Sequence, residues 1–236
     1  MKTVEIGVLL PSYNEAAALP SILRGIPSII QQKGVSYKIT PIVIDDGSSD
    51  NTRKVVLSVK GVVLIQHIIN SGAGAATRTG ISYLRNTNYE YGATMDADGQ
   101  HSPADLEKVL RACLKGECDI VLGSRLKNTD GMPWYKVVGN RGLNFFTRIL
   151  LGVSSSDSQS GLKAFNRKTI ENLNYRENGY AFCSEMLWRA KKAQLTIKEV
   201  PIQAIYSEYS KSKGQSNWNA FQIIKQMVRH RIKEIS

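Results

Sequence analysis

The sequence alternates between short apolar runs and helical patterns, and the connections between them are short. Strands are expected at residues 4–10, 39–44, 62–66, 91–95 and 119–125, with helices at 16–30, 52–60, 72–85 and 103–116. Strands that are apolar along their length need cover on both faces, as the strands of a parallel sheet have. We therefore predict an α/β fold with a mostly parallel, Rossmann-like central sheet and helices on both of its faces.

The later part of the chain has a weaker pattern. We expect a loop over residues 127–144, a polar loop over 154–161, strands at 162–165 and 197–202, and helices at 144–151 and 184–193. The helix at 144–151 has an exposed-looking apolar face, and the strand at 197–202 contains a proline that is typical of a sheet edge. We find no internal repeat and no low-complexity linker. We therefore expect one domain over residues 1–215, followed by a basic amphipathic helix over residues 216–236.

Composition limits the class of protein. The 236 residues are 42% hydrophobic, which is enough to bury a sizeable core. Three cysteines, Cys113, Cys118 and Cys183, have no metal-type spacing and argue against a disulfide scaffold, which fits a reducing compartment. No apolar run approaches the length of about 18 residues that a membrane span needs, and the N-terminus does not resemble a signal peptide. We expect a soluble or peripheral cytoplasmic protein.

The formal net charge of +11 indicates an anionic partner, unless the basic residues only form a solvated surface. The candidates are nucleotide phosphates, an anionic membrane face or nucleic acid. A nucleic-acid-binding protein would need basic residues interleaved with aromatic ones on one face, and residues 209–218 offer only a little of this. We therefore expect no nucleic-acid partner.

Residues 94–101 carry two carboxylates, Asp96 and Asp98, at the end of an apolar approach. If the approach is a strand, both side chains point to the same side, because strand side chains alternate, and Gly99 lets the backbone turn. Two hard oxygen ligands with Gln100 beside them suit Mg²⁺ or Mn²⁺ better than zinc, and such sites leave room for substrate phosphates. For an isolated pair, the alternative is an acidic turn at a strand end.

Other polar residues fall at the same expected edge of the sheet, where ligands of open α/β sheets bind. Tyr13 could stack on a nucleobase, and Asp45 or Asp46 could accept from a base or ribose, although each could also only pack or cap a turn. Arg125 could pair with a diphosphate or be a surface arginine. The glycine-rich residues 72–76 lack the last glycine of a dinucleotide fingerprint. We interpret them as a helix start that needs close backbone packing.

Taken in order, these stretches closely resemble the family 2 glycosyltransferases with a GT-A fold. The branch that they resemble most contains dolichyl-phosphate mannose synthases and polyprenyl-phosphate glucosyltransferases. The matching stretches are residues 11–15, 43–50, 70–80, 96–101, 123–125, 139–144, 157–165, 185–187 and 199–202. The resemblance implies a GT-A glycosyltransferase domain over residues 1–215. It also implies inverting, metal-dependent transfer of a hexose from a UDP- or GDP-linked sugar to a polyprenyl or dolichyl phosphate.

The resemblance also implies roles for particular residues. The nucleotide sugar would contact Pro11, Tyr13, Glu15, Asp45, Asp46, Asp96, Ala97, Asp98, Arg125 and Lys213. Mg²⁺ or Mn²⁺ would be held by Asp96, Asp98 and Gln100. The catalytic residues would be Asp98, Arg125, Asp157 and Glu185.

The acceptor determines whether a general base is needed. A lipid phosphate is already ionised at neutral pH, whereas a saccharide hydroxyl, as in cell-surface polysaccharide synthesis, must lose a proton to a base. Asp157 and Glu185 are the candidate bases, and their alternatives are a loop cap and a charge at a helix start. The mannose synthases carry an arginine where this chain has Ser207. This departure leaves the sugar and the nucleotide open.

The C-terminal stretch from Trp218 to Ile235 has apolar residues at helical spacing with basic residues beside them. This pattern is typical of an interfacial helix on an anionic membrane. It is equally typical of a helix that packs an apolar stripe on the core. A third alternative is docking to a small membrane subunit. We therefore expect a peripheral protein at the inner face of the membrane.

Overall fold

The computed structural model of the chain describes residues 3–206 and 221–229. Its strands are β1 (Thr3–Ser12), β2 (Ile29–Gln32), β3 (Val35–Asp45), β4 (Val63–Gln66), β5 (Tyr91–Thr94), β6 (Ile120–Ser124), β7 (Lys163–Asn166) and β8 (Ile197–Pro201). Its helices are α1 (Leu19–Gly25), α2 (Thr52–Leu57), α3 (Ala73–Arg85), α4 (Pro103–Cys113), the 3₁₀ turn η1 (Arg125–Lys127), α5 (Trp134–Leu151), α6 (Arg167–Asn172) and α7 (Phe182–Lys192).

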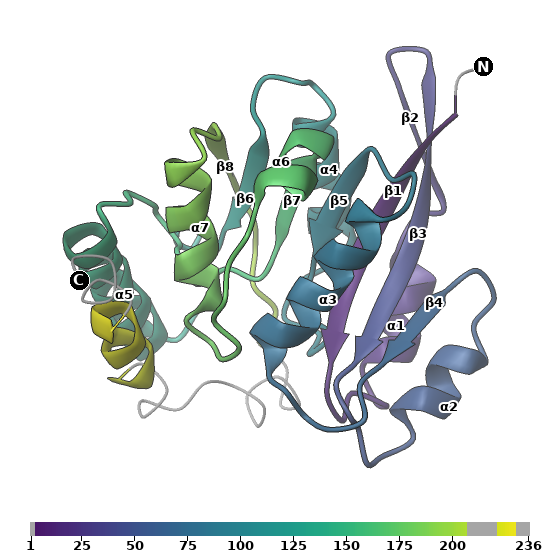
Figure 1. Cartoon of the computed structure of the whole chain (residues 1–236), viewed down its shortest axis with the longest axis horizontal. Coiled ribbons are helices and arrows are strands. Elements are labelled where there is room, and N and C mark those ends of the chain that lie inside the picture. Colours follow the sequence, from purple (N-terminus) through teal and green to yellow (C-terminus); the bar gives the residue numbers. More distant parts are fainter. Residues whose placement is uncertain (1–2, 207–220, 230–236) are drawn as a thin grey trace.

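Eight strands of the described residues form one sheet with helices on both faces (Figure 1). The order is β2-β3-β1-β5-β7-β6-β8, and β4 also pairs with β3. β2 and β7 run antiparallel to their neighbours, and all other pairs are parallel. The prediction of a mostly parallel α/β sheet is confirmed, as is the edge position of β8. The antiparallel direction of β7 was not predicted.

The single helix expected over residues 16–30 is wrong, because the segment forms α1 and then β2. Pro20 lies in the first turn of α1, where a proline is tolerated, and Pro27 disfavours further helix. β2 and β3 form a hairpin through Lys33 and Gly34, whose φ angles are 48° and 75°. Two positive φ angles suit the type I′ turn of a two-residue hairpin. β3 therefore begins earlier than expected.

The loop expected over residues 127–144 is also wrong over much of its length, because α5 begins at Trp134. Pro133 immediately precedes the helix, and Gly139 and Gly142 lie within it. Glycine weakens the helical signal of a sequence. The helix also has apolar residues on its exposed side. The spacing of its apolar residues in the sequence therefore does not show which side is buried.

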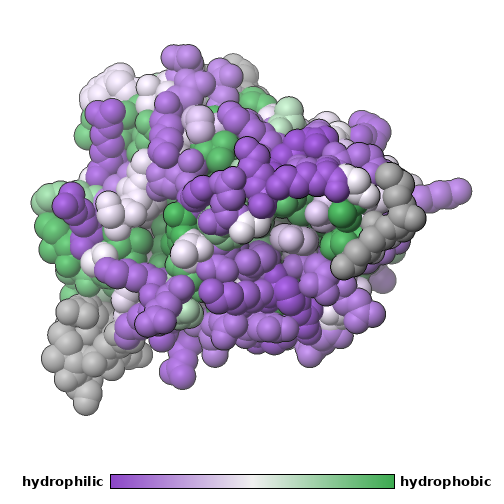
Figure 2. Space-filling view, turned by 90° about the horizontal axis from the view of Figure 1, so that it is seen from above, coloured by the Kyte–Doolittle hydropathy of each residue, from purple (hydrophilic) through white to green (hydrophobic). Residues whose placement is uncertain are grey.

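The exposed apolar face expected on the second half of α5 is present and extends to its first turn. Trp134 is 77% exposed, Val138 61%, Phe145 59% and Ile149 61%. Hydrophobic atoms gather at the left end of the molecule in Figure 2, the end that α5 and residues 221–229 occupy in Figure 1. Exposed apolar surface of this extent marks an interaction site more often than a monomer surface.

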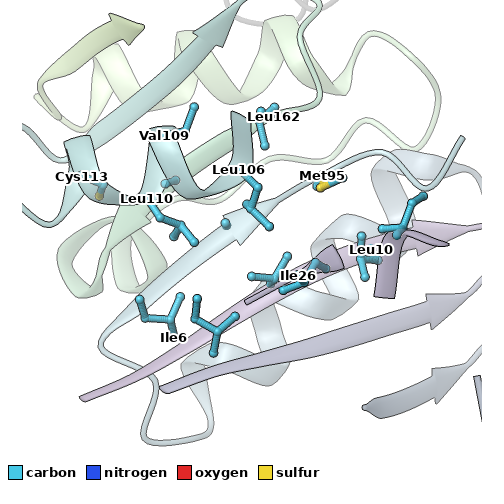
Figure 3. Close-up of a cluster of buried hydrophobic side chains, with 14 of the residues drawn as sticks. Ile6, Leu10, Ile26, Met95, Leu106, Val109, Leu110, Cys113 and Leu162 are labelled. Atoms are coloured by element: carbon cyan, nitrogen blue, oxygen red, sulfur yellow. The ribbon is translucent and has the colours of Figure 1, made fainter. Parts of the chain in front are cut away.

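Alternate residues of β1 pack into two cores on opposite faces of the sheet. Ile6 and Leu10 face α1 and α4, where they pack with residues such as Leu106 (Figure 3). Leu9 faces α3 on the other side, where it packs with residues such as Leu84. All five side chains are fully buried. The strand is therefore apolar on both sides because both of its faces are covered.

α4 begins at a side-chain cap. The hydroxyl of Ser102 accepts a hydrogen bond from the backbone N–H of Asp105 at 3.0 Å, and Pro103 is the first helical residue. A proline at this position loses no intrahelical hydrogen bond. The cap fixes where the loop that carries the two acidic residues ends.

Residues 221–229 form a helix that packs with α5 and α7 in a third hydrophobic core, separate from the two described above. Ile223 and Met227 are buried there, so part of this helix packs on the core. Phe221 and Val228, which belong to the stripe identified in the sequence, are 59% and 37% exposed. Ile224 of the same stripe is partly buried against this core, so the stripe faces partly the core and partly solvent.

Some sequence predictions fall outside the described residues. These are Lys213, Ser207, and the parts of the C-terminal stripe at residues 218–220 and 230–235. Among helices within residues 3–206 and 221–229, none is long and apolar enough to cross a membrane.

Candidate active site

A cavity of about 470 Å³ lies at the edge of the sheet where β1, β5 and β6 end. It brings together most of the residues that we placed in the site from the sequence: Pro11, Tyr13, Glu15, Asp96, Ala97, Asp98, Gln100 and Arg125. Asp45, Asp46, Asp157 and Glu185 are not among the lining residues. The expected position of the site, at the carboxyl edge of the sheet, agrees with this cavity.

The acidic pair lies in the loop between β5 and α4. β5 ends at Thr94, so Asp96 and Asp98 come after the strand rather than within it, yet both line the cavity. Gly99 turns the backbone at a φ of 79°. Gln100 donates from its backbone N–H to Asp98 Oδ1 at 2.9 Å and from its side-chain amide to Oδ2 at 2.6 Å. These hydrogen bonds fix the orientation of one carboxylate.

The two carboxylates have opposite pKa shifts. Removal from water and the charge of Asp96 raise the pKa of Asp98 above its ordinary value. Removal from water also opposes ionisation of Asp96, but His101, 3.5 Å away, together with Lys163 and Arg125, outweighs it and lowers the pKa of Asp96. Asp96 is therefore the more acidic of the pair, and Asp98 is the group that repulsion most destabilises.

The pair fits a hard divalent cation such as Mg²⁺ or Mn²⁺. Both residues offer carboxylate oxygens to the same cavity, which are the ligands that these ions prefer. A cation between them would remove the repulsion that raises the pKa of Asp98. The described part of the chain contains no group of three His, Cys, Asp or Glu side chains that could hold a metal. The remaining ligands would therefore come from Gln100, water or substrate phosphates.

Two residues that we missed in the sequence lie behind Asp96. A side chain on Gly161 would overlap the Asp96 carboxylate, so glycine at this position lets the carboxylate keep its place. Lys163 is fully buried, with its ammonium group at the carbonyl of Ser160 and 3.6 Å from the sulfur of Cys183. A buried ammonium group is a strong local charge. No signal in the sequence distinguishes this lysine from a surface lysine.

Arg125 forms a buried, two-pronged ion pair with Asp157. Arg125 Nε lies 2.8 Å from Asp157 Oδ2 and Nη2 lies 2.8 Å from Oδ1, while the backbone N–H of Arg125 donates to Oδ2 at 2.9 Å. Burial alone would lower the pKa of Arg125, but Asp157 outweighs it and raises that pKa. Asp157 therefore lies behind the guanidinium group and orients it toward the cavity.

The carboxylates of Asp45 and Asp46 have different surroundings, although the residues are adjacent. Asp45 is fully buried, its Oδ1 accepts from the backbone N–H of Ser48 at 3.0 Å, and its Oδ2 has no hydrogen-bond partner among the described residues. A buried oxygen without a partner is costly, so Asp45 fits an N–H donor from a ligand. Asp46 instead binds His67 at 2.7 Å and the backbone N–H groups of residues 71–72.

The turn after β1 places an aromatic ring at the cavity. Asn14 adopts a left-handed φ of 55°, and its side-chain oxygen accepts from the backbone N–H groups of residues 49–50. The backbone N–H of Glu15 donates to Thr52 at 2.9 Å. These bonds join the turns after β1 and β3. Tyr13, which is 43% exposed, is therefore held on a fixed backbone at the cavity.

Glu185 supports a loop instead of lining the cavity. It is buried on α7, and its Oε2 accepts from the backbone N–H groups of Arg176 and Glu177 at 3.0 and 2.7 Å. Its Oε1 pairs with Arg189 at 3.2 Å. The loop that it holds carries Tyr180, which lines the cavity. Glu185 thus contributes to the site through this loop.

The glycine-rich residues 72–76 form the start of α3 and its preceding residue. Gly72 has a φ of 97°, and a side chain on Gly74 would overlap the backbone oxygen of Glu177. The N–H of Gly74 donates to the carbonyl of Asn178 at 2.7 Å. The interpretation of this stretch as a closely packed helix start is confirmed.

α5 and the segment after β8 supply lining residues that we did not predict. Lys136 and Asn140 of α5 line the cavity, as does Tyr206. The ammonium group of Lys136 lies 4.8 Å from the centre of the Tyr206 ring, within the range of a cation–π contact. The spacing of four residues between Lys136 and Asn140 is a helical signal. We missed it because we expected a loop there.

A mostly parallel sheet with two carboxylates and an arginine at its carboxyl edge defines an α/β enzyme with a site suited to a metal ion and phosphates. The sequence model of glycosyl transferase family 2 matches residues 7–173. The chain belongs to this family and is a glycosyltransferase.

Two relatives with known names are similar over most of their length. The UDP-N-acetylglucosamine–dolichyl-phosphate N-acetylglucosaminyltransferase of Methanococcus voltae is 35% identical over 94% of each chain. The polyprenol monophosphomannose synthase of Mycolicibacterium smegmatis is 31% identical over 87% of this chain and 79% of its own. These names match the branch that the sequence resembles.

A solved structure shows the same fold. Glucosyl-3-phosphoglycerate synthase from Mycobacterium tuberculosis, in complex with Mn²⁺, UDP-glucose and phosphoglyceric acid, superposes with a TM-score of 0.71 and 19% identity. The match covers 97% of this chain and 79% of that one. The expected GT-A fold is confirmed.

Proposed function

We propose that the protein transfers a hexose, with inversion, from a nucleotide-diphosphate sugar to a polyprenyl or dolichyl phosphate. The observation that carries this proposal is the arrangement of α5. Its inner side lines the cavity with Lys136 and Asn140, and its exposed side carries Trp134, Val138 and Phe145. An acceptor with a phosphate on a long apolar chain needs a polar cavity for the phosphate and an apolar surface beside it for the chain. The relatives named above, which act on dolichyl phosphate or make a polyprenol phosphomannose, support this acceptor.

The donor would bind along the edge of the sheet. Pro11, Tyr13 and Glu15, which line the cavity, would hold the nucleoside. Asp45 does not line the cavity, but its Oδ2 has no hydrogen-bond partner among the described residues and would accept an N–H of the base. Uracil and guanine both carry such an N–H, so UDP- and GDP-sugars both fit this contact. Asp46 would act through the loop before α3. Ala97 would lie against the sugar-phosphate from between the two acidic residues.

Departure of the nucleoside diphosphate leaves negative charge that the site must stabilise. Asp96 and Asp98, with Gln100, would hold Mg²⁺ or Mn²⁺, which when bound would neutralise part of that charge. Arg125 and Lys136 line the same cavity and would supply fixed positive charges to the diphosphate or to the acceptor phosphate. Lys213, outside the described residues, remains a proposed contact to the diphosphate.

The positions of the two candidate bases favour a phosphate acceptor over a hydroxyl acceptor. Asp157 and Glu185, the two bases considered for a hydroxyl acceptor, are buried and held by hydrogen bonds away from the cavity. An ionised acceptor phosphate needs no proton removed. We therefore favour the lipid phosphate over a saccharide hydroxyl.

The acceptor also requires contact with a membrane. We propose that the exposed faces of α5 and of residues 221–229 rest on the inner face of the membrane or on a small membrane subunit. Phe145 and Ile149 on α5 and Phe221 on the C-terminal helix are each more than half exposed. Arg148 and Lys225 belong to the same two helices and could contact anionic headgroups.

The test is a transfer assay with purified full-length protein, Mg²⁺ or Mn²⁺, a short polyprenyl phosphate and a panel of UDP- and GDP-sugars. A glycolipid formed from one donor would support the proposal and identify the sugar and nucleotide. Donor binding without a lipid product, in the presence of membranes, would contradict the lipid acceptor. Failure to bind any donor would contradict the whole assignment.

Membrane contact has its own test. The parent protein should sediment with vesicles that contain anionic lipid. A variant in which Phe145 and Ile149 are both changed to Ser should sediment with them much less. Because both side chains are exposed, the variant should keep its thermal midpoint. Equal sedimentation of the two proteins would exclude α5 as the contact surface.

A further inference from the structure

We infer that Glu199 of β8 is a positioning residue that fixes Arg125 by joining the two segments that carry the Arg125–Asp157 pair. The inference rests on the proposed role of Arg125 at the phosphates. Glu199 does not line the main cavity. Its effect on transfer would therefore pass through other residues.

One set of contacts joins Glu199 to the loop that carries Asp157. Glu199 Oε1 accepts from the hydroxyl of Ser155 at 2.9 Å and from the backbone N–H of Ser156 at 2.8 Å. Its Oε2 accepts from the hydroxyl of Ser156 at 2.6 Å. Asp157 is the next residue in the chain. The position of its backbone is thus set by three hydrogen bonds to one carboxylate.

A second set of contacts joins Glu199 to the segment that carries Arg125. Lys127, at the end of η1, pairs with Glu199 Oε2 at 3.2 Å and donates to the Glu199 backbone oxygen at 3.4 Å. The hydroxyl of Ser124, directly before Arg125, lies 2.7 Å from the hydroxyl of Ser156. Ser124, one residue before Arg125, is therefore linked to Glu199 through Ser156, and Lys127, two residues after it, is linked directly.

The carboxylate is suited to this position. Partial burial opposes its ionisation, but the hydrogen bonds from Ser156 and Ser155 outweigh it and lower the pKa of Glu199. A glutamine side chain at this position would replace one oxygen with an NH₂ group. That group donates hydrogen bonds, and it would face serine or lysine groups that also donate. Because two nitrogens of Arg125 are already bound to Asp157, a shift of the serine loop would move the whole guanidinium group.

The substitution Glu199→Gln tests the inference, with Glu117→Gln as the matched control. Glu117 pairs with Lys198, the neighbour of Glu199 on β8, at 2.6 Å, and both of these side chains are 56% exposed. We expect Glu199→Gln to lower kcat/KM about 10- to 100-fold, since small misplacements of a positioned group can cost that much. Glu117→Gln should leave kcat/KM unchanged. Equal effects of the two substitutions would overturn the inference.

A double-mutant cycle separates positioning from general destabilisation. In an Arg125→Met background, Glu199→Gln should cause little further loss, because the group that it positions is absent. A full additional loss in that background would overturn the inference while leaving the role of Arg125 intact. Wild-type transfer by Arg125→Met alone would contradict the proposed role of Arg125 and with it this inference.

A milder variant covers the case in which Glu199→Gln does not fold. Ser156→Ala removes the hydrogen bond to Glu199 Oε2 and the contact with Ser124, and leaves both charges in place. It should reduce kcat/KM in the parent and not in the Arg125→Met background. The same loss in both backgrounds would overturn the inference.

Discussion

Replacing Asp157 with asparagine should destabilise the fold strongly, because it would leave a buried arginine without its counter-charge. Side-chain exposure is 11% for Arg125 and 0% for Asp157, and three nitrogens of Arg125 donate to the carboxylate. Asparagine keeps one acceptor oxygen and turns an NH₂ group toward a donor. Removing one partner of a buried pair costs about 3–5 kcal/mol. For a chain of this length, that loss corresponds to a fall in Tm of roughly 6–20 °C.

Urea unfolding followed by tryptophan fluorescence would measure the change in the free energy of unfolding. The control is Glu5→Gln, which breaks an ion pair with Lys38 whose side chains are 35% and 59% exposed. That substitution should cost at most about 1 kcal/mol. The double variant with Arg125→Met should recover much of the stability lost by Asp157→Asn, since no unpaired charge remains.

The result that would refute this reasoning is specific. If Asp157→Asn keeps its free energy of unfolding within about 1 kcal/mol of the parent and loses only kcat, the carboxylate is not the counter-charge of the arginine. A proton-transfer role for Asp157 would then be the better explanation. Glycosyl transfer to a hydroxyl acceptor would also have to be reconsidered.

Three further outcomes are expected. Asp98→Ala, or a chelator, should lower transfer at least about 100-fold without lowering Tm, and full activity in the variant would remove the metal role. Gly161→Ala should weaken Mn²⁺ binding measured by electron paramagnetic resonance, because the new methyl group displaces Asp96; an unchanged Kd would contradict this. Burial opposes ionisation of Asp119, but hydrogen bonds led by Thr196 lower its pKa to about 2. It should therefore contribute about 2 kcal/mol above pH 4, lost as the pH falls toward 2, and Asp119→Asn should abolish this part of the acid dependence in urea unfolding.

The sequence predicts the fold class and the location of the site because both depend on local patterns. Apolar runs of strand length reveal β1 and β3, and the polar residues that end them mark the edge where Tyr13 and Asp96 lie. Parallel strands place their carboxyl ends together, so these residues meet without any knowledge of pairing. The cavity contains them for that reason.

The partners of individual charges could not be predicted, because they depend on contacts between distant segments. Arg125 and Asp157 are 32 residues apart and belong to strands β6 and β7 or the loops beside them, whose antiparallel pairing no local pattern shows. A loop acid that pairs with an arginine has the same sequence signature as a catalytic base. α5 was partly missed for a different reason, since an apolar residue such as Val138 faces outward instead of toward a core.

The antiparallel strand β7 lies between β5 and β6 and so sets a fixed distance across the site. Neighbouring strands are about 4.8 Å apart, so the ends of β5 and β6 are separated by about two such spacings, roughly 10 Å. Even across this gap, the charge of Arg125 lowers the pKa of Asp96. The inserted strand thus places the acidic pair and the arginine after two strands that are not neighbours, and both groups line the same cavity.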